Sequence, residues 1–417
     1  MLLLAFLDGT YLFRHYLKPW EPYSYQQFDD DRLKVIAHGI LGYSRYNVQP
    51  WKVVFRSNDT TSFYLHVDTT RAFPYTDPYA RRGTFAQGTF IEHVVNGAGH
   101  MALEARVELF PQGEYDIEGR HIDLSRLPAA RITIVPGESS DNTLYLGMFK
   151  TATSLRPFDD TPVPTRLEHF FNRLNDDREL RIQVISDREQ RRTISRIASE
   201  AAEVERTLPD SLFEHRIFRV NEHQKNEHRD GLTLDAFRPS FPMKFLWQSM
   251  RTVVPVGNRS GRLKVLNALV KSAETAPAFL LVSSRGNGRL AQLKAGMLFA
   301  RIQMAAAQMG LTIQPLTQVL GSYPEIFESY IDLQRQFAIR GFSTQMLAAI
   351  GTQQGEIALA PRRNPADLVQ FVKIKKPKKP KPPRPAFTPT RSAETPDTLR
   401  TRPRRRKLPS KYKTVPR

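Results

Sequence analysis

The chain has 417 residues, no cysteine and a formal net charge of +19. The lack of cysteine excludes thiol catalysis, disulfides and cysteine-ligated metal sites. No apolar run reaches the roughly 18 residues of a membrane-spanning helix, which predicts a cytoplasmic protein. Residues 1–7 are apolar, however, so a membrane-associated or exported protein remains the alternative if a segment precedes them.

The positive charge is concentrated near the C-terminus. Residues 373–417 contain 17 Lys or Arg against 2 acids, a net charge of +15, and 10 of the 30 prolines. A segment with so few large apolar residues buries too little surface to fold, so we expect a disordered basic tail. Such a tail can bind an anionic partner, nucleic acid or acidic lipid, without specificity. A merely solubilising extension is the alternative.

Hydrophobic periodicity divides the rest of the chain into an N-terminal arm (1–28), a first unit (29–145) and a second unit (146–372). In the first unit the pattern predicts a helix after the acidic run 29–31, a second helix at 80–105, and strands at 52–56, 62–67, 106–110 and 131–135. In the second unit it predicts helices at 164–174, 188–206, 263–272 and 290–309, strands at 181–186, 278–283 and 356–360, and a polar insert at 208–261.

One stretch between the first helix and the first strand stands out, Asn47-Val48-Gln49-Pro50-Trp51. Proline fits neither inside a helix nor inside a central strand, so the stretch is predicted to be a rigid connecting loop. Its two amides can donate to and accept from the polar edge of a planar ring. A well-packed loop around a core tryptophan is the alternative interpretation.

This stretch resembles the Asn-x-Gln-Pro-Trp signature of nitroreductase-like flavin enzymes. Further ordered motifs resemble a subgroup in which two halves are fused in one chain: Asp68-Thr69-Thr70-Arg71, Asp77-Pro78, Arg81-Arg82, Gly88, Ala295-Gly296 and Arg362-Arg363-Asn364-Pro365. The resemblance implies an α+β, nitroreductase-like fold. Its two halves would form an intrachain pseudo-dimer within a monomer, each half a mixed or antiparallel sheet flanked by helices.

An internal repeat agrees with two fused halves. Aligning Gly88 with Gly296, a shift of 208 positions, places the small residues 97–99 on the small residues 305–307 and Met101 on Met309. Small residues at these helix positions allow another helix to approach closely. The pattern therefore suggests that the two units are copies of one another.

The spacings of eight and five between His215, His223 and His228 do not place two ligands on one helical face, so no metal site is expected. The resemblance implies one composite FMN site. The first half would contribute Ser44, Arg45, Asn47, Gln49 and Trp51. The second half would contribute Ser154 and Arg156, and the C-terminal motif Arg362 and Arg363, because an arginine fork suits a flavin phosphate. Ala152 stands where the family has a first arginine, and Tyr43-Ser44-Arg45-Tyr46 replaces Pro-Ser-Ser-His, so weaker flavin binding is expected.

The implied activity is hydride transfer from NAD(P)H to FMN and then to a small-molecule acceptor, a nitro compound or a quinone, in ping-pong order. No side-chain acid or base is indicated for this reaction. The alternative is a flavin-holding homologue, weakly active or inactive, in which the insert acts as a lid. The insert carries Phe237, Phe241, Phe245, Leu246 and Trp247, which would cap the pocket or pack between the halves.

Overall fold

The computed structural model describes residues 9, 11–115, 121–139, 143–209, 218–219, 221–237 and 258–373. They fall within one compact unit, residues 1–374. The second unit, residues 375–417, holds nearly all of the predicted tail and lies outside the described residues. Phe241, Phe245, Leu246 and Trp247 of the insert also lie outside them.

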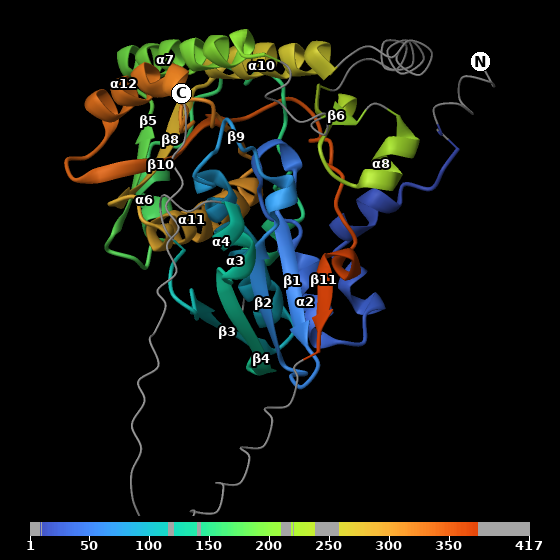
Figure 1. The fold of residues 1–417 in the computed structure, drawn as a ribbon. Coiled ribbons are helices and arrows are strands. Elements are labelled where there is room, and N and C mark those ends of the chain that lie inside the picture. The colour runs from blue at the N-terminus through green and yellow to red at the C-terminus, as the bar shows by residue number, and fades with distance from the viewer. Residues whose placement is uncertain are drawn as a thin grey trace, which may run out of the picture. The chain divides into compact units, whose positions relative to one another are not determined.

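A five-stranded sheet forms the first half, in the order β11-β1-β2-β4-β3 (Figure 1). Neighbouring strands are antiparallel except β11 and β1, which are parallel. Alternating burial along β1 fits a strand with one face in the core. The C-terminal strand β11 completes this sheet, although the sequence assigned its residues to the second half. The strands are β1 Trp51–Arg56, β2 Ser62–Val67, β3 Leu103–Leu109, β4 Ala130–Pro136 and β11 Val369–Val372.

A four-stranded antiparallel sheet forms the second half, in the order β5-β8-β10-β9. Seven of the eight residues of β8 are buried, as expected for a central strand covered on both faces. Along the chain, the first half runs β1-β2-α3-β3-β4 and the second runs β5-β8-α11-β9-β10, with matching strand orders. The strands are β5 Leu180–Ile185, β8 Ala278–Arg285, β9 Thr312–Pro315 and β10 Phe342–Gly351.

The helices α3 (Arg81–His100) and α11 (Arg289–Gln308) pack against each other between the sheets. Both have 20 residues, and both ends differ by the same 208 positions that relate Gly88 to Gly296. A Cβ atom on Gly88 would lie 1.9 Å from the carbonyl oxygen of Leu293, and one on Gly296 2.1 Å from that of Phe85. Phe85 and Leu293 are themselves 208 positions apart, so the contact has two-fold pseudo-symmetry.

Helices cover both faces of the second sheet. Figure 1 shows α7, α10 and α12 along one face and α11 along the other. Leu281 and Leu347 face the first group, and Leu280 and Ala348 face α11, so successive strand residues join different clusters. The remaining helices are α2 Asp31–Gly39, α4 His121–Arg126, α5 Tyr145–Met148, α6 Leu167–Asn172, α7 Arg188–Thr207, α8 Glu222–His228, α10 Asn258–Thr275 and α12 Phe327–Phe337.

The structure corrects several predicted boundaries. The helix predicted at 80–105 ends at His100, because residues 103–109 alternate in burial and form β3. Residues 356–360, predicted as a strand, form no regular element. The strands β9, β10 and β11 and the helix α12 were not predicted. The predicted start of the first long helix agrees with the structure. The side chain of Asp30 accepts a hydrogen bond from the backbone N–H of Arg32 and so caps the N-terminus of α2.

The insert extends the connection between β5 and β8, where the first half has only a short turn between β1 and β2. Its described part contains α8 and a two-stranded parallel ribbon, β6 (Phe218–Arg219) and β7 (Leu232–Thr233). Among the described helices, none is long and apolar enough to span a bilayer.

Candidate functional site

The connection between α2 and β1 that contains the Asn-x-Gln-Pro-Trp motif, residues 44–51, is called the signature loop below. It has an uncommon backbone conformation. Tyr46, Asn47 and Gln49 have φ angles of 51°, 56° and 52°. Residues with a Cβ atom avoid this left-handed region, which costs about 1–2 kcal/mol per residue. Three such residues within four positions show that contacts around the loop hold it in place. Strained backbone of this kind is concentrated at functional sites.

Two of the predicted cofactor residues pack the loop itself. The Ser44 hydroxyl accepts a hydrogen bond from the backbone N–H of Gln49 at 2.9 Å. Trp51 is completely buried, and its indole N–H donates to the carbonyl oxygen of Ala86 on α3 at 2.9 Å. Its ring packs against Phe90. Trp51 therefore anchors the loop to α3, as the alternative interpretation of this residue proposed.

Asn47 joins three parts of the chain. Its side-chain N–H groups donate to the carbonyl oxygens of Gly231 in the insert, at 3.0 Å, and Pro361, at 2.8 Å. Its side-chain oxygen accepts a hydrogen bond from Arg362. The backbone N–H of Gly231 also donates to the Asn47 carbonyl oxygen at 2.9 Å. The insert and the C-terminal segment (residues 358–362) therefore both form hydrogen bonds with the signature loop.

Gln49 makes a parallel set of contacts. Its side-chain N–H donates to the carbonyl oxygen of Arg229 at 2.9 Å, and its side-chain oxygen accepts from the backbone N–H of Arg363 at 3.0 Å. The Arg363 guanidinium donates to the carbonyl oxygens of Gln49 and Trp51, both at 3.2 Å. Burial lowers the pKa of Arg363 to about 10. The nearest carboxylate in the described chain, that of Asp68, lies 4.0 Å away.

Arg362 is a buried cation that pairs with no carboxylate in the described part of the chain. Its guanidinium donates to Asn47 and to the carbonyl oxygen of Leu41 and lies 4.7 Å from the centre of the Trp20 ring. Its Nε–H has no hydrogen-bond partner. Burial lowers the pKa of Arg362 to about 9. An uncompensated charge of this kind is costly unless an anion or an acceptor meets it.

Arg45, by contrast, is already neutralised. Its guanidinium lies 2.8 Å from both carboxylate oxygens of Glu205 on α7, and Tyr46 donates to the same carboxylate at 2.5 Å. Burial alone would lower the pKa of Arg45, but the negative charge of Glu205 outweighs it and raises that pKa. The pKa of Tyr46 is raised by burial. Arg45 is therefore bound to the second half rather than held available for a phosphate.

The segment predicted to supply Ser154 and Arg156 alternates its side chains. Thr151, Thr153 and Leu155 line a pocket beside the signature loop. Ser154 and Arg156 do not line it: Arg156 donates to the Ser154 hydroxyl at 3.0 Å and to backbone carbonyl groups of residues 354 and 356. The segment therefore lies beside the signature loop, but its alternate residues Thr151, Thr153 and Leu155 face the pocket instead of Ser154 and Arg156.

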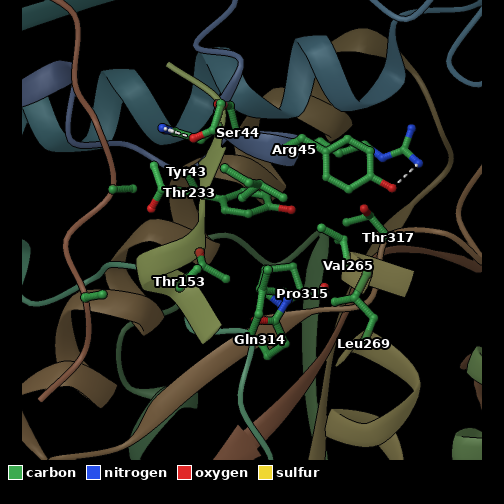
Figure 2. Close-up of a pocket in the computed structure, with 18 of the residues that line it drawn as sticks. Tyr43, Ser44, Arg45, Thr153, Thr233, Val265, Leu269, Gln314, Pro315 and Thr317 are labelled. Atoms are coloured by element: carbon green, nitrogen blue, oxygen red, sulfur yellow. Dashed lines mark hydrogen bonds between the residues drawn. The ribbon is translucent and has the colours of Figure 1, made fainter. Parts of the chain in front are cut away.

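The pocket lies where the two halves, the insert and the C-terminal segment meet. Figure 2 shows Tyr43, Ser44 and Arg45 on one side and Val265, Leu269, Gln314 and Pro315 on the other. No acidic side chain lines it among the described residues. The lining residues are Tyr43, Ser44, Arg45, Tyr46, Asn47, Thr151, Thr153, Leu155, Gly231, Leu232, Thr233, Ala236, Val265, Leu269, Gln314, Pro315, Thr317, Gln318, Ala358, Leu359, Ala360 and Arg362.

Three buried polar atoms of this wall have no hydrogen-bond partner: Nε of Arg45, Nε of Arg362 and Oε1 of Gln314. Leaving such an atom unpaired costs about 1–3 kcal/mol. Arg45 lies across the pocket from Gln314, so the donor of Arg362 and the acceptor of Gln314 are the pair that suits one ligand edge with a carbonyl oxygen and an N–H group. The chemistry of the wall therefore fits a flavin ring. The free cavity is about 60 Å³, however, which holds a few water molecules, so a tricyclic ring would need the walls to part.

Sequence reasoning missed several lining residues. Period-two alternation groups Thr151, Thr153 and Leu155 on one side of segment 151–155, but it does not show which side faces the pocket. Gln314 and Thr317 carried no such signal, because the short strand β9 that positions Gln314 was not predicted. Among the described residues, no cluster of His, Asp and Glu has the arrangement of a metal site.

Comparison with known proteins finds no matching family model and no matching curated relative. Solved structures similar to this chain include oxidised iodotyrosine deiodinase bound to FMN and 3-iodo-L-tyrosine, with 13% identity over 53% of this chain and 95% of that chain and a TM-score of 0.31. The FMN-dependent nitroreductase NfnB from Mycobacterium smegmatis in complex with NADPH has 13% identity over 54% and 95%, with a TM-score of 0.34.

A nitroreductase-like family protein from Bacillus cereus has 12% identity over 57% of this chain and 99% of that chain, with a TM-score of 0.31. Each of these proteins is thus matched over nearly its whole length by about half of this chain. Scores this low do not support a functional conclusion by themselves. The function proposed below depends on the residues of this chain.

Proposed function

We propose that the pocket is an FMN site and that the chain is a nitroreductase-like oxidoreductase. Electrons would pass from NAD(P)H to a small-molecule acceptor, a nitro compound or a quinone. The observation that carries the proposal is Arg362, a buried cation without a carboxylate partner in the described chain. It is hydrogen-bonded to Asn47 of the signature loop in the wall of an acid-free pocket.

Each group of residues would have its own role in binding the cofactor. FMN would supply the chemistry of hydride transfer between NAD(P)H and the second substrate, in ping-pong order. Arg362 and Arg363 supply positive charge toward the anionic cofactor, and the amides of Asn47 and Gln49 exchange their present carbonyl partners for the ring edge. Ser44, Arg45 and Trp51 hold the loop in its strained shape. Ser154 and Arg156, which do not line the pocket, would hold the lining residues Thr153 and Leu155 in place through their own hydrogen bonds.

A tandem duplication accounts best for this architecture. The two halves share one order of strands and a 20-residue helix with the same end points after a shift of 208. One copy would have kept the signature loop, and the other would have gained the insert between β5 and β8. The result is an intrachain pseudo-dimer with one cofactor site per chain.

A flavin titration tests the main proposal. The purified protein, incubated with FMN and desalted, should keep a flavin absorption spectrum at about one FMN per chain. NADH or NADPH should bleach it under anaerobic conditions, and a nitroaromatic compound or a quinone should restore it. A protein that retains no flavin would overturn the FMN site. A flavin that neither nucleotide bleaches would overturn the oxidoreductase.

The second candidate function is a flavin-holding protein with a lid. It is favoured by the hydrogen bonds of residues 229–231 to Asn47 and Gln49, which occupy the amides that a flavin would need. Asp230 strengthens this contact through ion pairs with Arg71 and Arg219. Replacing residues 221–237 by a short Gly-Ser linker should then raise the rate of flavin reduction by NAD(P)H. An unchanged rate in a folded variant that binds FMN would count against the lid.

A further inference from the structure

Gln314 occupies an unusual position in the pocket wall. It lies on β9 of the second half, is 3% exposed and lines the pocket together with Arg362. Figure 2 shows it beside Pro315, across the pocket from Tyr43 and Ser44. Neither the signature loop nor the arginines predicted from sequence include this residue.

The orientation of the Gln314 amide is fixed by a contact within the chain. Its side-chain N–H donates to the carbonyl oxygen of Pro315 at 3.1 Å. A carbonyl oxygen can only accept, so the nitrogen must be the atom that faces it, and this assigns the two ends of the amide. The other end, Oε1, is buried and has no hydrogen-bond partner. Gln314, a residue that lines the pocket, therefore has a fixed and unused acceptor atom just behind the wall.

An unused donor among the residues that line the pocket indicates what this acceptor can bind. Nε–H of Arg362 is also buried and unpaired. A complementary ligand carries one N–H group next to carbonyl oxygens. The pyrimidine edge of a flavin has this pattern, since its N3–H lies between the C2 and C4 carbonyl groups.

We infer that Gln314 determines cofactor specificity by accepting a hydrogen bond from an imide N–H, N3–H of the flavin ring, while Arg362 donates to an adjacent carbonyl oxygen. This inference depends on the proposed FMN site. It adds to that site a residue of the second half that forms a hydrogen bond with the edge of the flavin ring. The flavin ring would then form hydrogen bonds with both halves, with Asn47 on one side and with Gln314 on the other.

The test compares FMN with N3-methyl-FMN, which lacks the N3 proton. Wild-type protein should bind FMN about tenfold more tightly, because the methyl group removes the donor and leaves Oε1 of Gln314 unpaired. Gln314→Leu should bind both flavins with similar dissociation constants. Fluorescence quenching of each flavin during titration gives the four constants.

Gln303 provides a matched control. It lies on α11, is 4% exposed and also has an unpaired Oε1, but it does not line the pocket. Gln303→Leu should keep the tenfold preference. Thermal unfolding of both variants separates a folding defect from a loss of recognition.

The outcomes are distinguishable. Equal binding of the two flavins by wild-type protein would overturn the role of Gln314 while leaving the FMN site intact, and it needs no variant. A preference that survives in Gln314→Leu would assign the N3 contact to another group and likewise overturn the inference. Binding of neither flavin would overturn both the FMN site and this inference.

Discussion

The unpaired charge of Arg362 gives the site a defined pH dependence. Burial lowers the pKa of Arg362 to about 9, well below that of an exposed arginine, so the unfolded chain holds this proton more tightly than the folded chain. The charge therefore opposes folding at neutral pH, and this unfavourable contribution decreases as the pH rises above about 9. An anionic ligand binds the protonated form of Arg362 and offsets the free-energy cost of burying its charge.

FMN affinity should accordingly be constant from pH 7 to about 8.5 and fall as the pH rises through about 9. Arg362→Gln should bind FMN about 10- to 150-fold more weakly at pH 7, since a charge-assisted hydrogen bond contributes about 1.5–3 kcal/mol. It should also lose the part of the pH dependence that belongs to Arg362. Equilibrium titrations across this pH range measure both effects. Identical pH profiles for the two proteins would contradict the role given to Arg362.

Glu205 should be one of the most sensitive residues for stability. It is completely buried and neutralises Arg45 while accepting a hydrogen bond from Tyr46. Glu205→Gln leaves the Arg45 charge buried and unpaired, which should lower the free energy of unfolding by about 3–5 kcal/mol. Glu200→Gln removes an exposed ion pair on the same helix and should change it by less than about 0.5 kcal/mol. Urea denaturation compares the two variants, and similar losses would argue against the buried pair.

At the scale of elements, the contact between α3 and α11 sets the spacing of the two halves. A methyl group on Gly88 would collide with the backbone of Leu293, whereas one on Gly83, in the same helix, has no atom closer than 3.6 Å. Gly88→Ala should therefore destabilise the protein by about 1–3 kcal/mol or more. Gly83→Ala should stabilise it by about 0.5–1 kcal/mol through helix propensity. Thermal unfolding that moves both variants in the same direction would show that the close approach is not rigid.

The insert is the other element that decides the state of the site. Its segment 229–231 bonds the signature loop, and Tyr16 of the N-terminal arm donates to Glu222 of α8 at 2.7 Å. Glu222 also pairs with the fully buried Lys225. The described part of the insert is therefore held by buried polar contacts on two sides. Residues of the insert and of the C-terminal segment 358–362 line the pocket, so both segments border the space that a ligand would fill.

At the scale of the molecule, the basic C-terminal region is proposed to tether the chain to an anionic surface. Residues 374–417 lie outside the described residues, so this proposal depends on charge alone. Removing them should abolish co-sedimentation with phosphatidylserine vesicles, or retention on nucleic acid, while leaving the FMN spectrum unchanged. Whichever binding is lost identifies the surface. Binding that persists after truncation would exclude the tether, and a full-length protein that binds neither would leave a solubilising role.

The sequence alone determined the local features. Capping by Asp30, the strands β1 and β2, and the ends of α11 within one residue follow from side-chain chemistry over a few positions. The 208-residue repeat could also be found in the sequence, because small residues recur at equivalent positions of the two helices that became α3 and α11.

Tertiary structure decided what those features contact. Only the fold could show that β11 joins the first sheet, that Glu205 neutralises Arg45, or that Thr153 rather than Ser154 faces the pocket. Each depends on contacts between residues far apart in the chain, or on the rotation of an irregular segment, and local sequence encodes neither. The unpaired Nε of Arg362 and Oε1 of Gln314 belong to the same class. An atom lacks a partner only by virtue of everything packed around it.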